Sequence, residues 1–287
     1  MMFSTQPAAL PTGGHHVIDQ YCTYQKLLGF STATVKRRRN TLENLQRFIA
    51  PTPLHRATGP DIEHWLGTKK AARTRHAYLS DLRQFFSWAT KRELTDTDPS
   101  IQIGSIKVPK SLPRPFGDDV TVLLEHGALP IRQRVALGLF AGMRCAEIAN
   151  LHGEDLSLHS DPPSVVIRGG KGGKDRAVAL HADAVRLLRD APREGPLFPG
   201  RTGACVTSGT VSMSIRRHLQ RCGLTGVPHQ LRHTFGTEAA RRSNGDMLVI
   251  ADLMGHTSAE TTKGYCQLAA TRGADIIAKM FQPNDAA

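Results

Sequence analysis

Apolar residues recur at helical spacing in four stretches of the first third of the chain. Ser31 and Thr32, either of which suits a helix N-cap, separate the first two stretches, and the fourth is RTRHAYLSDLRQFFSWATK, residues 73–91. The apolar positions are Val17, Ile18, Tyr21, Tyr24, Leu28, Val35, Leu42, Leu45, Ile49, Tyr78, Leu82, Phe85 and Ala89. The pattern predicts a compact helical bundle over residues 15–95, after a disordered N-terminus over residues 1–14.

The helical pattern stops at residues 96–116, where prolines and glycines predict an extended linker. Beyond it, the segment PSVVIRGGKGGKDRAVAL, residues 163–180, has two apolar-rich runs around a Gly-Lys-Gly-Gly-Lys turn, which is typical of a β-hairpin. Helical spacing predicts further helices near residues 118–127, 130–143, 181–190, 209–222, 231–242, 246–254 and 270–282. The expected fold class is mainly α with a small β-sheet, in which the helical bundle precedes an α+β domain over residues 117–287.

The composition narrows the class of protein. A hydrophobic fraction of 40% in 287 residues is enough for buried cores. No apolar run reaches the roughly 18 residues that a membrane-spanning helix needs, and the N-terminus has no secretory signal pattern. Five cysteines are scattered without CxxC spacing, which fits a reducing cytoplasm better than a disulfide framework or a zinc site.

The charge indicates a polyanionic partner. Lys and Arg exceed Asp and Glu by 12, and the excess is larger in residues 1–110 than in the rest of the chain. Clustered cations gain affinity for nucleic acid by releasing counterions from phosphates. The candidate phosphate contacts in the first domain are Arg37, Arg38, Lys69, Lys70, Arg73 and Arg75; for each of them a solvated basic surface is the alternative interpretation.

Two segments of the second half each contain a cationic residue that is a candidate for a catalytic or phosphate-binding role. In AGMRCAEIANL, Arg144 lies three residues before Glu147, a spacing that an ordinary surface ion pair also has. In GGKGGKDR, Lys171 lies in a glycine-rich turn from which its ammonium group could reach a phosphate oxygen. A P-loop is the obvious alternative, but the GxxxxGK[ST] pattern is absent, and a flexible turn without function remains open.

Two further segments contain histidines and a tyrosine that are candidate functional residues. In VPHQLRHTFGTEAARR, His229 and Arg232 are three residues apart and share one helix face. His229 and His233 are also spaced to bind a metal, but no third ligand is evident. In GHTSAETTKGYCQL, His256 precedes Tyr265, and a single tyrosine is most often a packing residue.

The order of these groups resembles that of the tyrosine recombinases, the family of phage integrases and Xer-type resolvases. The matching segments are GMRCAEIANL, GGKGGKDRAVAL, HQLRHTFGTEA and LMGHTSAETTKGY, which cover most of residues 113–268. The resemblance implies a SAM-like core-binding domain over residues 15–95 and a recombinase catalytic domain that ends in a tail helix. The catalytic set that it implies is Arg144, Lys171, His229, Arg232, His256 and Tyr265.

The resemblance also implies a role for each group. Tyr265 would attack a DNA phosphodiester, giving a 3′-phosphotyrosyl link and a free 5′ hydroxyl. The two arginines would clamp the non-bridging oxygens, Lys171 would protonate the departing 5′ oxygen, His229 would serve in proton transfer, and His256 would hydrogen-bond the phosphate. Glu147 would orient the clamp, and Lys174 and Arg176 would contact the DNA backbone.

The partners that the resemblance implies are double-stranded DNA with core-type recombination sites and three further copies of the chain, in a homotetramer. Neither a metal nor another cofactor is expected. A directionality factor is a further partner that the family allows. The tail helix at 270–282 is expected to dock on a neighbouring protomer, with packing on its own domain as the alternative. The short segment before the first helix leaves no room for an arm-binding domain, so short core sites are expected.

Three alternatives remain open. A type IB topoisomerase uses a similar set of residues, although the His-x-x-Arg segment and the helical first domain favour a recombinase. A DNA-binding protein without catalysis would be expected to lack part of the catalytic set. Within the recombinases, the sequence favours an integrase of a phage or mobile element, with a Xer-type resolvase as the alternative.

Overall fold

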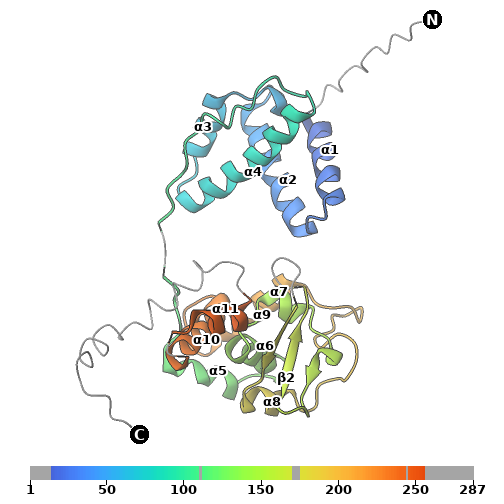
Figure 1. The fold of residues 1–287 in the computed structure, drawn as a ribbon, viewed down its shortest axis with the longest axis vertical. Helices are drawn as coiled ribbons and strands as arrows, with labels where there is room; N and C mark the ends of the chain where they lie inside the picture. The colour runs from blue at the N-terminus through green and yellow to red at the C-terminus, as the bar shows by residue number, and fades with distance from the viewer. Residues whose placement is uncertain (1–13, 110–111, 170–174, 244, 256–287) are drawn as a thin grey trace, which may run out of the picture. The chain divides into compact units, whose positions relative to one another are not determined.

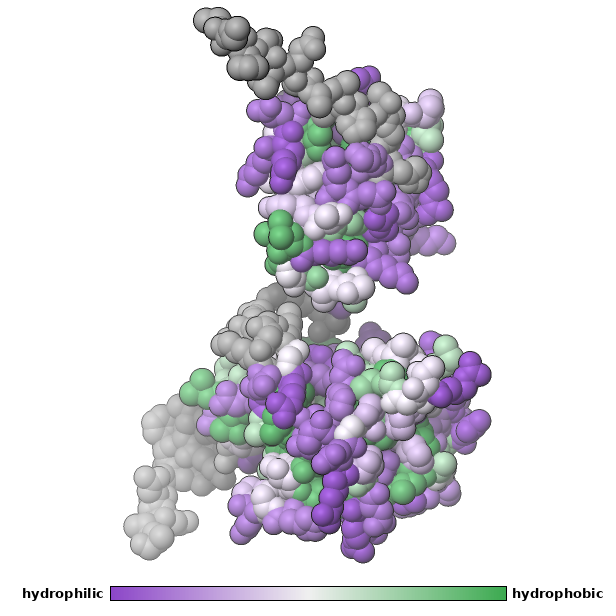
Figure 2. All heavy atoms as spheres, turned by 90° about the vertical axis from the view of Figure 1, so that its right-hand side faces the viewer, coloured by the Kyte–Doolittle hydropathy of each residue, from purple (hydrophilic) through white to green (hydrophobic). Residues whose placement is uncertain are grey.

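The computed structural model describes residues 14–109, 112–169, 175–243 and 245–255. The chain divides into two compact units, residues 1–110 and 111–287 (Figure 1). The tail helix predicted at 270–282 and most of the predicted N-terminal segment lie outside the described residues. Polar side chains cover most of the visible face of each unit, and exposed apolar residues occur there in small separate patches (Figure 2). Among the described residues, no helix is both long and apolar enough to cross a membrane.

The first unit contains the four predicted helices. These are α1 (Gly14–Leu27), α2 (Thr32–Ile49), α3 (Gly59–Gly67) and α4 (Ala72–Lys91), with a short 3-10 helix, η1 (Leu54–Arg56), before α3. Ser31 is the N-cap of α2, because its hydroxyl accepts a hydrogen bond from the backbone N–H of Thr34. A reciprocal capping box between Thr58 and Asp61 starts α3.

Aromatic side chains fill the core of this unit. Tyr21, Trp65 and Phe85 are almost fully buried, and the rings of Tyr21 and Phe85 meet edge to face at a centroid distance of 5.4 Å. Leu28, which the helical spacing placed on the buried face of α1, is 54% exposed. The prediction was wrong there because α1 ends at Leu27 and Gly29, at φ 77°, turns the chain away.

The predicted linker is partly packed against the first unit. Ile103 is buried in the aromatic core, and the guanidinium of Arg83 donates a hydrogen bond of 2.5 Å to its carbonyl oxygen. At the other end of the segment, Phe116 packs against the core of the second unit, and its N–H donates to the hydroxyl of Thr234.

The second unit wraps short helices around a central one. The elements in order are η2 (Asp118–Thr121), α5 (Val122–Glu125), α6 (Leu129–Phe140), α7 (Cys145–Ala149), η3 (Gly153–Asp155), β1 (Leu156–Ser157), β2 (Ser164–Ile167), β3 (Arg176–Ala179), α8 (Ala182–Leu188), α9 (Ser208–Arg221), α10 (His229–Arg242) and α11 (Met247–Met254). Helix α6 packs against α5, α8, α9 and α10, so it forms the centre of the core. The helix predicted at 118–127 is reduced to a 3-10 turn and a single α-helical turn.

The predicted hairpin is confirmed, and a third strand that was not predicted pairs with it. Strands β1, β2 and β3 form an antiparallel sheet in that order, and Ile167 lies opposite Arg176 in the register of β2 and β3. Ile167 and Val178 are buried, whereas Ala177 and Ala179 are exposed. Because side chains alternate between the two faces of a strand, Arg176 points to the same interior face as Val178.

A buried carboxylate links two helices of the first unit. Asp81 on α4 is 1% exposed, accepts hydrogen bonds from Arg37 and Thr41 on α2, and lies 3.7 Å from the Nε of Arg38. Desolvation raises the pKa of Asp81 in spite of the two arginines, so its partners offset the cost of burying its charge only in part.

The first prediction concerns this carboxylate. Asp81→Ala should lower the free energy of unfolding of the first unit by about 3 kcal/mol, because it leaves the buried Thr41 hydroxyl and the largely enclosed Arg38 guanidinium without their acceptor. Asp19→Ala removes the exposed carboxylate that pairs with Arg39 and should cost less than about 1 kcal/mol. Both tryptophans of the chain, Trp65 and Trp88, lie in this unit, so urea unfolding followed by tryptophan fluorescence measures it selectively. Equal losses for the two variants would contradict the prediction.

Candidate active site

The first catalytic candidate begins a helix. Arg144 is the N-cap residue of α7, and its side chain is 28% exposed. Glu147, in the first turn of α7, folds back on it: one carboxylate oxygen accepts from the Arg144 guanidinium at 2.7 Å, and the other accepts from the Arg144 backbone N–H at 2.8 Å. The carboxylate therefore fixes the backbone and the side chain of Arg144 together.

A second arginine binds the same carboxylate. Arg176 on β3 donates to both oxygens of Glu147, at 3.1 and 2.9 Å, and its side chain is only 9% exposed. Burial raises the pKa of Glu147, but the hydrogen bonds from Arg176 and Arg144 outweigh it and lower that pKa to about 2. A DNA-backbone contact was expected of Arg176, whereas the structure places its guanidinium in the interior because the sheet register turns it inward.

The third arginine is buried between two helix ends. Arg232 on α10 is 2% exposed, and its guanidinium donates to the carbonyl oxygens of Gly142 and Met254. Gly142 follows the C-terminus of α6, and Met254 is the last residue of α11. The C-terminal ends of both helices, which carry partial negative charge, thus face one permanent cation.

Two left-handed glycines shape these helix ends. Gly142 has φ 60°, and a Cβ atom there would lie 2.4 Å from a ring carbon of Phe235 on α10. Gly255, the C-cap of α11, has φ 57°, and a Cβ atom there would lie 2.9 Å from the Cδ of Arg176. The two turns therefore bring the chain close to α10 and to Arg176, which any larger residue would prevent.

The two histidines at the start of α10 lie beside this cluster. The rings of His229 and His233 meet edge to face, with centroids 4.6 Å apart. Desolvation, followed by the charges of Arg232 and Arg144, lowers the pKa of His229. Desolvation, His229 and Arg232 lower the pKa of His233 to about 4. Both imidazoles are therefore neutral at pH 7. The described residues contain no group of three His, Cys, Asp or Glu side chains that could hold a metal ion.

The structure brings Arg144, His229 and Arg232 together, and adds Glu147 and Arg176 to them. Figure 1 shows α10, which carries His229 and Arg232, beside α11, whose last carbonyl Arg232 binds. Lys171, Lys174, His256 and Tyr265 lie outside the described residues. In sequence, His256 directly follows Gly255. Asp175 accepts a hydrogen bond of 2.8 Å from the N–H of Gly169, at the base of the turn that contains both lysines.

The two predicted phosphate contacts on α2 form some of their contacts with other residues of the first unit. Arg37 pairs with Asp81 but keeps half of its side chain exposed, whereas the side chain of Arg38 is 12% exposed and its guanidinium lies 4.5 Å from the centre of the Phe30 ring. Arg38 is therefore mainly a packing residue of this unit, and Arg37 is the one of the two that faces solvent.

The candidates in the α3–α4 turn and in the first turn of α4 lie closer to solvent. Lys69 lies over the ring of Trp65 at 4.8 Å, and Arg75 donates to the carbonyls of residues 69 and 70. These contacts fix the turn between the two helices. Lys70 and Arg73 are exposed.

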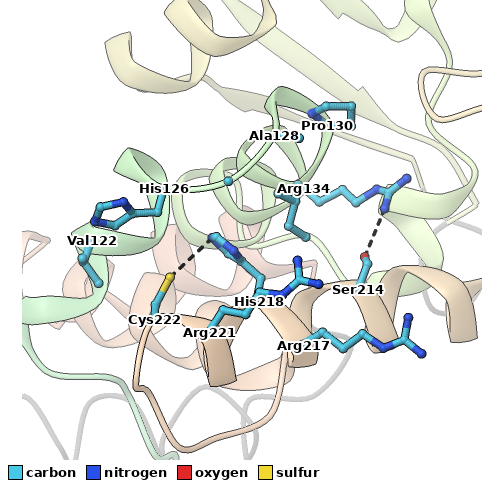
Figure 3. A pocket seen from close by; sticks show the side chains of 12 residues that line it. Val122, His126, Ala128, Pro130, Arg134, Ser214, Arg217, His218, Arg221 and Cys222 are labelled. Atoms are coloured by element: carbon cyan, nitrogen blue, oxygen red, sulfur yellow. Dashed lines mark hydrogen bonds between the residues drawn. The ribbon is translucent and has the colours of Figure 1, made fainter.

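A basic pocket of about 740 Å³ lies between the α5–α6 turn and α9 (Figure 3). Arg134, Arg217 and Arg221 line it together with His126 and His218, and no acidic residue does. Arg134 donates to the hydroxyl of Ser214 at 3.1 Å. No described carboxylate forms an ion pair with any of the three arginines. Helical spacing alone places Arg217 and Arg221 four residues apart on the helix predicted near 209–222, but it gives no sign that Arg134 and His126 lie beside them.

Comparisons with known proteins agree with this architecture. The phage integrase family matches residues 118–272, and the chain therefore belongs to that family, whose members are tyrosine recombinases. Tyrosine recombinase XerC of Lactobacillus delbrueckii subsp. bulgaricus is 31% identical over 229 residues, which cover 71% of this chain and 76% of the relative. XerC of Xanthomonas campestris pv. campestris is 32% identical over 66% of this chain and 62% of the relative.

Solved structures show the same fold. A lambda integrase dimer bound to a core site superposes with a TM-score of 0.68 at 19% identity, covering 85% of this chain and 95% of that one. XerH recombinase bound to a palindromic difH substrate gives a TM-score of 0.69 at 19% identity, covering 95% and 86%. The expected fold class and the resemblance to tyrosine recombinases are confirmed, and the class of enzyme is a site-specific DNA recombinase.

The second prediction separates backbone strain from steric contact at the site. Gly142→Ala should lower the free energy of unfolding of the second unit by about 3 kcal/mol, since a left-handed alanine is strained and its methyl group overlaps the Phe235 ring. Gly169→Ala is the matched control, because Gly169 has φ 58° but no atom within 4 Å of an added Cβ, so only about 1 kcal/mol should be lost. Calorimetric unfolding of the two variants measures the difference, and equal losses would show that contact with Phe235 does not matter.

Proposed function

We propose that this recombinase cuts and rejoins double-stranded DNA through a covalent 3′-phosphotyrosyl intermediate on Tyr265. The phenolic oxygen attacks phosphorus, the P–O5′ bond breaks, and the 5′ oxygen leaves with a proton. Attack of a 5′ hydroxyl from another strand on the same phosphorus reverses these steps and releases the tyrosine. The energy of the broken bond is retained in the ester, so rejoining needs no nucleotide cofactor.

One observation carries this proposal: Arg144, Arg232 and His229, which come from two distant segments, lie in one cluster. Arg232 binds the carbonyl of Gly142, two residues before Arg144. Arg144 is 28% exposed and can meet a non-bridging oxygen where it lies, whereas Arg232, 2% exposed, is proposed to reach one by exchanging a carbonyl partner for it. Guanidinium groups held in place before substrate binds suit these oxygens, whose negative charge grows in the transition state. Removing one such preorganised donor typically costs about 3 to 4 kcal/mol of transition-state stabilisation.

The proton transfers are assigned to groups beside the clamp. Lys171, in the hairpin turn that follows β2, donates the proton to the departing 5′ oxygen. His229 is neutral at pH 7, since its surroundings lower its pKa, and a neutral imidazole can accept the phenolic proton of Tyr265. His256 follows the left-handed Gly255 and donates a hydrogen bond to the phosphate.

Double-stranded DNA is the proposed partner of both units. The net charge of +12 and the pocket arginines without a carboxylate partner among the described residues support a polyanionic ligand. Lambda integrase has been solved as a tetramer on a Holliday junction. By analogy, we propose that four copies of this chain assemble on two core-type sites, with the helical unit as the core-binding domain.

The biological role is proposed as integration of a phage or mobile element. Resolution of replicon multimers is the second candidate, because the curated relatives quoted above are XerC recombinases. Sequencing the DNA that is covalently attached to the protein in host cells distinguishes the two. Adducts at junctions between an element and its host favour an integrase, whereas adducts at one replicon site without an element favour a resolvase.

The third prediction tests the nucleophile. Tyr265→Phe should abolish covalent adducts that survive denaturant, because it lacks the attacking oxygen, and should leave DNA affinity within about threefold of the unchanged chain. Tyr24→Phe, which removes a half-buried phenol of the first unit, is the control and should keep normal adduct formation. The substrate is a nicked duplex that carries the captured site. Adducts of undiminished yield on the phenylalanine variant would rule out Tyr265.

The fourth prediction concerns metal. Cleavage and rejoining should continue at an unchanged rate in a strong chelator, because arginine, lysine and histidine supply the charge and the protons in the proposed mechanism. Rejoining of the nicked substrate with and without chelator measures this. Loss of activity that added divalent metal restores would contradict the proposed mechanism.

A further inference from the structure

A single carboxylate at the site carries four hydrogen bonds from two arginines. One oxygen of Glu147 accepts from the Arg144 guanidinium at 2.7 Å and from Arg176 at 3.1 Å, and the other accepts from the Arg144 backbone at 2.8 Å and from Arg176 at 2.9 Å. Glu147 and Arg176 have side chains only 7% and 9% exposed, whereas Arg144 is 28% exposed. Arg176 and Glu147 are therefore the buried members of the cluster, and Arg144 is its solvent-accessible member.

We propose that Arg176 is a positioning residue for the cleavage reaction, which acts on Arg144 through Glu147. This inference rests on the proposed function, because it assigns Arg176 a part in the same phosphate clamp. Arg176 does not touch the phosphate in this proposal. It holds the carboxylate that holds Arg144.

The geometry supports two effects of Arg176 on Arg144. The bidentate bond fixes the plane of the carboxylate, and the carboxylate in turn fixes the Arg144 side chain relative to its own backbone. Arg176 also shares the negative charge of Glu147. Without Arg176, that charge would be neutralised by Arg144 alone, and Arg144 would attract a phosphate less strongly.

Arg176 also contacts a third segment. Its Cδ and guanidinium lie about 3 Å from the Cβ position of Gly255, so it packs directly on the backbone that ends α11. Strand β3 follows the turn that contains Lys171, and Gly255 precedes His256 in sequence. One side chain therefore links the hairpin, the start of α7 and the end of α11, which carry or adjoin three of the proposed catalytic groups.

The test compares Arg176 with another arginine of the same sheet region. Arg168 pairs with the buried carboxylate of Asp155 at 2.6 Å, but it is 63% exposed, and within the described residues it forms no ion pair with Glu147. Arg176→Ala should slow single-turnover formation of the covalent adduct about 100-fold, since a misplacement of about 1 Å can have that effect. DNA affinity should stay within about threefold. Arg176→Lys, which keeps the charge but not the paired donors, should recover part of the rate, and Arg168→Ala should form adduct normally.

A double-mutant cycle shows whether Arg176 acts through Glu147. If it does, Arg176→Ala combined with Glu147→Gln should be no slower than the slower single variant, whereas independent roles would multiply the two losses. Multiplying losses, or a rate for Arg176→Ala equal to that for Arg168→Ala, would overturn the inference.

A measurement without DNA keeps this inference separate from the proposed function. In the full chain labelled with ¹³C at the glutamate carboxyls, the Glu147 signal should titrate with a pKa near 2, as Arg176 and Arg144 together dictate. In Arg176→Ala the pKa should rise, because burial remains while the larger set of hydrogen bonds is lost. An unchanged titration overturns the positioning role. Failure of the unaltered chain to form any adduct would instead count against the proposed function alone.

Discussion

The buried guanidinium of Arg232 is the constraint around which the second unit is arranged. A permanent cation at 2% exposure is stable only if fixed acceptors replace its water, and here the acceptors are the carbonyls of Gly142 and Met254. Both carbonyls lie at helix C-termini, where the aligned peptide dipoles leave partial negative charge. Both are also next to or on a left-handed glycine, which turns the chain sharply after its helix. A planar fork of donors can bind two carbonyls from different segments at once, which a single ammonium group does less well. The burial of one side chain therefore determines that the start of α7 and the end of α11 meet at α10.

The same cluster has an electrostatic consequence. Arg144, Arg176 and Arg232 bring three positive charges into a small region, and Glu147 is the carboxylate that pairs with two of them. Like charges at short range repel, so the arrangement retains a positive potential until an anion binds. Desolvation is the main cause of the lowered pKa values of His229 and His233, and the nearby arginines lower them further, because both effects disfavour imidazolium. One field thus attracts a phosphate and keeps an imidazole available to accept a proton. These two requirements would conflict if the site were built from histidine cations.

Helical periodicity predicted most of the fold because apolar spacing and capping residues are local properties. Ser31 and the faces of α2 and α4 were correct for that reason. Errors occurred where the backbone rather than the side-chain pattern decides the outcome. Gly29 ends α1 before Leu28, and Gly142 ends α6 three residues before the end of the predicted helix. The strand Leu156–Ser157 is too short for any alternation to show, and it is recognised by its pairing with the edge of β2.

The residues of the candidate site could be predicted from the sequence, but their burial and their hydrogen-bond partners could not. The motifs name Arg144, His229 and Arg232, yet nothing in them tells which cation faces solvent and which is enclosed. For Arg176 a local signal existed: in Arg-Ala-Val-Ala-Leu the larger residues alternate with alanine, which places Arg176 on the face of Val178 and therefore in the interior. The expectation of a DNA contact at Arg176 followed the charge of the residue and did not use the alternation of the strand. Charge indicates that a residue can bind phosphate, but period decides whether its side chain can reach solvent to do so. The alternation of side chains along β3 places Arg176 on the buried face. Turning the guanidinium outward would require a shift of the strand by one residue, which would expose Val178.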